Sequence, residues 1–420
     1  MNFIKRIKIK LKGLLSKNRK ILLSSILFRI ELFIYFIIFT PFLCINRLLK
    51  KNNRLYFASF YSNRIGHFAP GFHIRFAKKK LKLEKKNCLY CFNEKVANSF
   101  FAKQVKKYFY VNRTIKFIII ICQTFTWLNC LVDEEPLNSQ RDIKGYTQKV
   151  KMPAFSYSEN DFCINWLKKN GWKGPSQKLI CIHVRDSSYL DKVVKKGKFK
   201  NNDFKYHSYR DSNIDLFSES IYWLIDQKAF VIRTGKIAYK EAKINSKNFL
   251  DYPFCDNQND LIDIWLFANA DLVISTGSGI DEVSGAYRVP RIYVNLLPIV
   301  DTPSWSRTLT IPKHLYWKSS KKHLQFEEYI KLKNISTTKE YINKGIEITS
   351  LSSKEILEVI KDGWAYYLDG SPFKEIDIKF TNEFKRYLMN DSLLNNYHEF
   401  MNKDWVISSN IFKNKKSFLK

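Results

Sequence analysis

Two short apolar segments of this chain end in residues that are suited to binding an anion. One, residues 179–182, leads into His183, Arg185 and Asp186. The other, residues 270–274, stops in a turn made of Ser275, Thr276, Gly277, Ser278 and Gly279. Glycines let a backbone approach a ligand closely, N–H groups at a following helix start point toward it, and a guanidinium fits a phosphate. Together these residues predict a nucleotide-sugar site, with the diphosphate held by the turn and the guanidinium.

Each of these residues also has a purely structural interpretation, which stays open. The turn can be a tight connection between strand and helix, and His183 can be a core histidine bonded to backbone. A salt bridge to Asp186 or Asp211 is the alternative for Arg185. Arg185 is still the strongest candidate, because open α/β sheets bind ligands at the carboxyl ends of their strands. Asp281, just inside the next helix, is expected to reach a sugar hydroxyl or to complement the helix dipole.

The elements that must position these residues alternate between strand and helix. Apolar runs predict strands over residues 54–60, 87–92, 178–184, 229–233, 270–275 and 291–295. Helices are expected after the loop 61–67 as far as residue 80, and over residues 94–109, 215–228, 260–267 and 279–287. A further helix is expected over residues 354–368, with Ser352 or Ser353 as its cap. Repeated β-α-β units of this spacing build parallel sheets that helices cover on both sides. We therefore expect an α/β fold with two Rossmann-like domains.

The length of 420 residues exceeds one ordinary core, and four parts are expected. Residues 1–50 are interpreted as a membrane-associating segment. Residues 51–170 are predicted to form an N-terminal Rossmann-like domain that binds the acceptor of a sugar. Residues 171–320 are predicted to form a second one that binds the nucleotide-sugar donor. Residues 321–420 are expected to be an accessory, partly helical region. Residues 113–132 are strongly apolar and are expected to be buried, and residues 133–153 are expected to form an irregular connection.

The formal net charge of +32 favours anionic partners, and part of it lies in residues 1–51, which hold twelve Lys and Arg against one Glu. The longest uncharged run there, residues 32–46, contains Pro41 and is short of the ~20 residues of a spanning helix. We expect a peripheral, monotopic or re-entrant anchor on an anionic membrane surface, at the cytoplasmic face of the inner membrane. The alternative is an amphipathic helix packed on the protein. Eight irregularly spaced cysteines fit reduced thiols.

Several motifs, taken together, resemble those of a bacterial family of surface-polysaccharide glycosyltransferases. The motifs are Arg64-Ile-Gly-His67, Ile182-His-Val-Arg-Asp186, Tyr209-Arg-Asp-Ser-Asn-Ile-Asp215, Phe230-Val-Ile-Arg-Thr-Gly235 and the stretch 270–279 with Pro290 and Asn295. More distantly, the chain is similar to the α1,6- and protein O-fucosyltransferase group, which has a variant GT-B fold. In that group the arginine of H-x-R contacts the donor pyrophosphate, which implies this role for Arg185. The second arginine that follows H-x-R in that group is missing here, which leaves the donor sugar open.

The resemblance implies an enzyme of hexosyl- or fucosyl-transferring type in cell-envelope polysaccharide biosynthesis. Its partners are then a nucleotide-diphosphate sugar and a glycan or lipid-linked acceptor. Such a reaction needs cationic groups on the leaving diphosphate and a base near the acceptor hydroxyl, for which Asp186 and His67 are the candidates. The sequence contains no Asp-x-Asp pair, the usual metal clamp of the other common glycosyltransferase fold. A metal-independent GT-B mechanism is therefore expected, with no metal site and no cofactor.

Two other functions stay open at this point. The strong positive charge would also suit a nucleic-acid-binding protein, although the basic residues form no RNP-like or zinc-finger pattern and nucleic acid is not the expected partner. A non-catalytic scaffold of a polysaccharide assembly complex is the third hypothesis. The complete set of donor motifs argues against the scaffold, and a test for transfer or donor hydrolysis separates the two.

Overall fold

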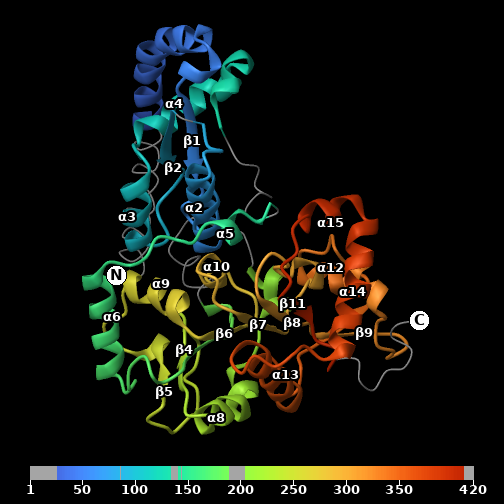
Figure 1. The fold of residues 1–420 in the computed structure, drawn as a ribbon. Coiled ribbons are helices and arrows are strands. Elements are labelled where there is room, and N and C mark those ends of the chain that lie inside the picture. Colours follow the sequence, from blue (N-terminus) through green and yellow to red (C-terminus); the bar gives the residue numbers. More distant parts are fainter. Residues whose placement is uncertain (1–25, 86, 134–140, 143, 189–203, 411–420) are drawn as a thin grey trace, which may run out of the picture. The chain divides into compact units, whose positions relative to one another are not determined.

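The structure is a computed structural model, and it describes residues 26–85, 87–133, 141, 142, 144–188 and 204–410 (Figure 1). The chain divides into two compact units. The first comprises residues 1–62, 83–95 and 105–135, and the second comprises residues 63–82, 96–104 and 136–420. Each unit is described by itself. The domain boundaries predicted near residues 50, 170 and 320 stay predictions.

The first unit contains two parallel strands, β1 (Tyr56–Phe60) and β2 (Cys88–Phe92). Isolated parallel bridges join Phe57 to Val132 and Tyr90 to Val111. Helical segments complete the unit: Ile26–Leu48, η1 (Lys51–Asn53), α4 (Thr114–Thr124) and η2 (Thr126–Leu131). Apolar side chains of α4 and η2 fill the core around Phe57, so the burial expected for residues 113–132 is confirmed in part; Trp127 is 48% exposed.

The second unit is built on a seven-stranded sheet in which every strand pair is parallel. The strands are β3 (Leu179–His183), β4 (Phe230–Arg233), β5 (Phe249–Asp251), β6 (Leu272–Ser275), β7 (Arg291–Val294), β8 (Thr308–Ile311) and β11 (Trp405–Ile407). Their order is β11-β8-β7-β6-β3-β4-β5. The chain therefore runs from β3 through β4 to β5 on one side, and from β6 to β8 on the other. This is the doubly wound order of an α/β protein, and the predicted α/β class is confirmed.

Helices cover both faces of this sheet. In Figure 1, α9 and α10 lie on one side of it, and α8 and α13 on the other. The helices of the unit are α2 (Ile65–Lys80), α5 (Tyr146–Lys149), α6 (Tyr157–Lys169), α8 (Ser218–Asp226), α9 (Asp260–Asn269), α10 (Asp281–Ala286), α11 (Phe326–Lys331), α12 (Thr338–Asn343), α13 (Ser353–Tyr367), α14 (Glu375–Asn390) and α15 (Ser392–Tyr397). Helix α3 (Ser99–Tyr108) starts in this unit and ends in the first.

Helix starts follow local capping chemistry. Ser352 accepts a hydrogen bond from the backbone of Glu355, and the Glu355 side chain bonds back to the cap, so the predicted cap of α13 is confirmed. Asn213 caps η5 (Ile214–Phe217), a 3₁₀ turn that leads directly into α8. Shorter 3₁₀ segments are η4 (Phe204–Arg210), η6 (Tyr252–Phe254) and η7 (Ile299–Asp301).

Residues 321–420 do more than extend the chain beyond the sheet. Strand β11 pairs with β8 and forms an edge of the large sheet, while α13 packs on β7. The small antiparallel pair β9 (His314–Trp317) and β10 (Ile346–Thr349) lies beside it in the same unit. The sequence patterns did not predict β5, β8, β9, β10 or β11, which are only three or four residues long.

Candidate functional site

The carboxyl ends of β3 and β6 meet where the strand order reverses. His183, the last residue of β3, lies opposite Ser275, the last residue of β6. From β3 the chain continues to one side of the sheet, and from β6 to the other. The loops that follow the two strands therefore diverge, and open parallel sheets bind ligands at this switch point. Arg185 and residues 275–279 follow these strand ends directly, as the sequence predicted.

The turn after β6 is held by its own hydrogen bonds. One carboxylate oxygen of Asp281 accepts bonds from Ser275 Oγ at 2.7 Å and from Ser278 N at 2.6 Å. Ser275 Oγ also accepts a bond from Gly277 N at 3.1 Å. Gly277 has a φ of +84°, which strains any other residue, and a Cβ there would lie 2.7 Å from Leu296 Cδ1, so that the leucine side chain would have to move. The turn is thus rigid before any ligand arrives.

Asp281 itself is completely buried, and its burial raises the pKa of the carboxyl group to about 6. Both facts place it as the residue that shapes the turn, while the sugar contact predicted for it stays a prediction. Ser275 and Thr276 are also buried. Ser278 is half-buried and Gly279 is exposed, so these two carry the accessible part of the turn.

Arg185 lies next to this turn. Its backbone N–H donates to Thr276 Oγ1 at 2.9 Å, and its Nε lies 3.4 Å from a carboxylate oxygen of Asp211. The salt bridge to Asp211 that the sequence left open is therefore present, and the Arg185 side chain is 15% exposed. Asp186, the other partner that the sequence left open for Arg185, has different contacts. Its two carboxylate oxygens accept hydrogen bonds from the backbone N–H groups of Ser188 and Tyr239.

A second arginine reaches the same turn from η4. Arg210 Nη2 donates to the carbonyl of Gly277 at 2.9 Å, and its Nε is buried with no hydrogen-bond partner among the described residues. Arg210 also lowers the pKa of Arg185 by its charge, after the larger effect of burial. The sequence placed Arg210 inside a motif, Tyr209 to Asp215, without giving it a role, and its position in that motif is the signal that could have found it.

Further basic groups join these two arginines. Burial, together with the charges of Arg185, Arg210 and Arg64, lowers the pKa of His207 to about 4. Lys313 donates to the carbonyl of Asp211 at 2.6 Å, and its burial lowers the pKa of the ammonium group to about 8. We refer to five residues as the strand-end cluster: Arg64, Arg185, His207, Arg210 and Lys313. At pH 7 its imidazole is neutral and its other members are cationic, opposed by the carboxylate of Asp211.

The start of α2 touches the turn as well. A Cβ on Gly66 would lie 2.5 Å from the Cα of Gly279, so two glycine backbones pack directly on each other. His67 follows on the same helix; burial, and then the charge of Arg64, lower the pKa of its imidazole. Its Nδ1 is buried and has no hydrogen-bond partner within the described part of the chain. The contact brings the predicted Arg64-to-His67 motif to the same strand ends.

His183 is oriented by its neighbours. Its Nδ1 lies 3.2 Å from Thr234 Oγ1, and its ring packs edge-on to Phe267. Burial lowers the pKa of its imidazole to about 4, so the ring is neutral at pH 7. This contact agrees with the alternative that His183 is a structural histidine hydrogen-bonded inside the protein. A role of His183 in donor binding stays a prediction.

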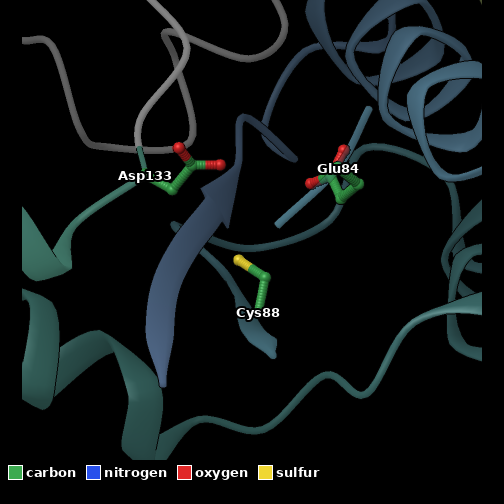
Figure 2. Close-up of side chains that lie close together, drawn as sticks. All are labelled: Glu84, Cys88 and Asp133. Atoms are coloured by element: carbon green, nitrogen blue, oxygen red, sulfur yellow. The ribbon is translucent and has the colours of Figure 1, made fainter. Parts of the chain in front are cut away.

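Three potential metal ligands gather elsewhere, in the first unit. Figure 2 shows Glu84, Cys88 and Asp133, whose ligand atoms lie within 4.8 Å of one another. Asp133 already pairs with Lys85 Nζ at 2.6 Å, and Glu84 accepts the hydroxyl of Tyr90. Because both carboxylates have protein partners, we assign no metal to this group.

Fold and site together define an α/β protein with a cationic site at the switch point of a doubly wound sheet. Its sequence matches no protein-family model and no curated protein. Among solved structures it is similar to an E. coli ADP-heptose LPS heptosyltransferase II, with 12% identity and a TM-score of 0.36, over 61% of this chain and 90% of that chain. These comparisons show no family, so the sequence resemblance to surface-polysaccharide glycosyltransferases stays a prediction.

Proposed function

We propose that this protein is a glycosyltransferase that moves a sugar from a nucleotide-diphosphate sugar to a surface glycan or lipid-linked acceptor. The observation that carries the proposal is the strand-end cluster at the switch point. Arg185 and Lys313 adjoin Asp211, near which Asp186 also lies, and Arg64 and Arg210 add further positive charge. An anionic ligand is the natural complement of such an excess of positive charge. A diphosphate fits it, because planar guanidinium groups bind phosphate oxygens in pairs.

The chemistry of glycosyl transfer suits the same residues. Negative charge builds up on the departing diphosphate, and fixed cationic groups lower the barrier most when they need no reorganisation. Arg210 is held by Gly277 O at 2.9 Å and Arg185 by Asp211 at 3.4 Å, so both guanidinium groups are already oriented. Within the described residues Arg210 Nε is buried without a hydrogen-bond partner, so the protein leaves this N–H of the guanidinium unused.

His67 is the better of the two candidate bases. A base must hold a free lone pair at the working pH, and the lowered pKa of His67 keeps its imidazole neutral at pH 7. The oxygens of Asp186 both accept hydrogen bonds from backbone N–H groups, of Ser188 and of Tyr239, so this carboxylate already has protein partners. We therefore propose that His67 accepts the proton of the acceptor hydroxyl.

A binding panel tests the proposal. The parent protein is titrated with GDP-, UDP-, CDP- and dTDP-sugars by thermal shift and calorimetry, and with single-stranded DNA and RNA in parallel. We expect at least one nucleotide sugar to bind and to be hydrolysed or transferred. Binding of nucleic acid alone, with the steep salt dependence of phosphate contacts, would establish the nucleic-acid hypothesis instead. Tight nucleotide-sugar binding without any turnover would support the scaffold.

We infer further that the reaction needs no divalent metal. The sequence has no Asp-x-Asp pair, and the strand-end cluster supplies positive charge for the diphosphate. A chelator should leave the transfer rate nearly unchanged, as measured by release of the nucleoside diphosphate. Complete loss of transfer in EDTA, restored by Mn²⁺ or Mg²⁺, contradicts this inference.

A further inference from the structure

The helix Ile26–Leu48 is long and apolar enough to cross a membrane, the one such helix among the described residues. It has 23 residues, and few of them are buried in the protein. The sequence predicted that this region would be too short to span, because the uncharged run is broken. A continuous helix forms all the same, so length alone does not decide how it meets a bilayer.

One face of this helix is fixed to the first unit. Leu43 is completely buried, and the Asn46 side chain exchanges two hydrogen bonds of 2.9 Å with the backbone of Leu55. Tyr35 stacks on Phe117 of α4 with ring centroids 4.7 Å apart. Near the other end, Glu31 pairs with Arg113 at 2.8 Å. These contacts run along most of the helix, from residue 31 to residue 46.

The opposite face is apolar and exposed. Its exposed side chains recur every three or four residues and so form one stripe: Ile26, Leu27, Ile30, Phe33, Ile34, Ile37, Ile38, Phe42, Ile45 and Leu48. Arg29 is the single charged residue of the helix that is exposed. A helix on the surface of a water-soluble protein normally presents polar residues outward. This stripe is therefore suited to an apolar medium and not to water.

Basic residues adjoin the stripe in the sequence. Residues 1–25, which lie outside the described residues, contain eight Lys and Arg and no acidic residue. Lys50, Lys51 and Arg54 follow the helix. Clusters of this kind next to an amphipathic helix bind membranes that contain anionic lipids. The apolar stripe alone would fit either a lipid surface or a second copy of the chain. The positive charge favours the lipid surface, because a second copy would carry the same charge.

We propose that the helix Ile26–Leu48 lies in the plane of an anionic bilayer. Its apolar stripe enters the boundary between headgroups and acyl chains, and its other face stays docked on the first unit. A spanning orientation would either separate the helix from α4 or carry the Glu31–Arg113 pair toward the hydrocarbon, and both are costly. The inference is independent of the proposed reaction.

Flotation of the full-length protein with vesicles tests the surface. Phosphatidylcholine vesicles are compared with vesicles that also contain phosphatidylglycerol. We expect strong binding to the anionic vesicles, and a loss of affinity of about tenfold or more for Ile34→Glu/Ile38→Glu. Both side chains are exposed, so the fold should be retained, as circular dichroism can verify. Tyr157→Glu/Ile342→Glu, which places the same two charges on exposed residues of the second unit, is the matched control.

Equal flotation of the double variant and the parent would overturn the proposal. A second result would also overturn it: the parent protein does not bind vesicles but forms dimers, and the Ile34→Glu/Ile38→Glu variant is monomeric. The stripe would then be an interface between two copies of the chain. Deletion of residues 1–50 is a poorer test, because it removes Leu43 and Asn46 from the core of the first unit.

A depth measurement separates the in-plane orientation from a spanning one. A fluorescent amino acid is placed at Ile30 or at Ile45, which lie roughly 22 Å apart along the helix axis. Quenching by lipids labelled at different depths should give the same depth for both positions. Depths that differ by most of that spacing show a spanning helix and refute the in-plane orientation.

Discussion

Arg185 and Arg210 lie twenty-five positions apart in the sequence, yet both contact the turn after β6. Arg185 donates from its backbone to Thr276, and Arg210 donates from its guanidinium to Gly277. At the residue scale, one turn brings together two arginines, Arg185 through its backbone and Arg210 through its guanidinium.

Replacing either arginine should weaken donor binding. Arg185→Ala or Arg210→Ala removes a charge-assisted contact to phosphate, a loss of roughly 2–5 kcal/mol in binding free energy. Arg185→Lys should recover only part of it, because an ammonium group lacks the bidentate fork. Calorimetry with the best nucleotide sugar measures the effect. Arg386→Ala, at an exposed arginine of α14, is the control. Unchanged affinity and turnover in folded Arg185→Ala protein would show that the residue is structural.

Gly277 has a steric role in the turn after β6. Gly277→Ala should destabilise the protein for two reasons, a positive φ and a collision with Leu296 at 2.7 Å. Gly345→Ala is the matched control, since Gly345 has a φ of +70° with no heavy atom within 4 Å of the added Cβ. We expect a cost of about 1 kcal/mol for Gly345→Ala and a clearly larger one for Gly277→Ala. Equal changes in melting temperature would mean that the Leu296 side chain simply moves aside.

At the scale of elements, the first turn of α2 is packed against the turn that begins α10. The packing depends on the absence of side chains at Gly66 and Gly279, whose backbones are in direct contact. Helix α2 also carries His67 and follows Arg64, so its position sets the distance between the candidate base and the arginines. A change in this one contact should therefore affect function more than stability.

Gly66→Ala should push α2 away from the turn and reduce turnover. Its added Cβ would lie 2.5 Å from the Cα of Gly279, a backbone atom that cannot rotate away. Gly71→Ala on the same helix meets nothing within 4 Å and should stabilise the protein by roughly 0.5–1 kcal/mol. Steady-state kinetics of the two variants make the comparison. If both retain the parent's kcat/KM, the α2 contact is not needed to align the site.

At the scale of the whole second unit, buried histidines make stability depend on pH. His73 bonds to the carbonyl of Val150, and His398 bonds to Ser304 and to the carbonyl of Val300. Burial lowers the pKa of both imidazoles to about 4, below the 6.5 of the unfolded chain. Between these values the unfolded chain binds more protons, so acid favours unfolding. Asp281 works in the opposite direction, because its pKa is raised to about 6 in the folded state.

We therefore expect the stability of the second unit to be greatest above pH 6.5 and to fall toward pH 5. Each of these two histidines contributes a loss of about 2 kcal/mol between pH 7 and pH 5, as does His183, whose pKa is also lowered to about 4, and Asp281 partly offsets the sum. Thermal melts at pH 7 and pH 5 measure the difference. Asp281→Asn should steepen the fall, and His398→Asn should flatten it. A melting temperature that does not change from pH 7 to pH 5 contradicts this assignment.

The sequence determined the features that depend on neighbours along the chain. The β3 and β6 strands, the glycine-containing turn after β6 and the Ser352 cap all follow from local periodicity, backbone freedom and hydrogen bonding. The tertiary structure alone decided which strands lie side by side, and so that His183 faces Ser275 at the switch point. It also decided that Arg210 and Gly66 contact the same turn. In the helix Ile26–Leu48, it decided which face packs on the first unit and which face is exposed. These outcomes depend on contacts between distant segments, whose energies no local pattern contains.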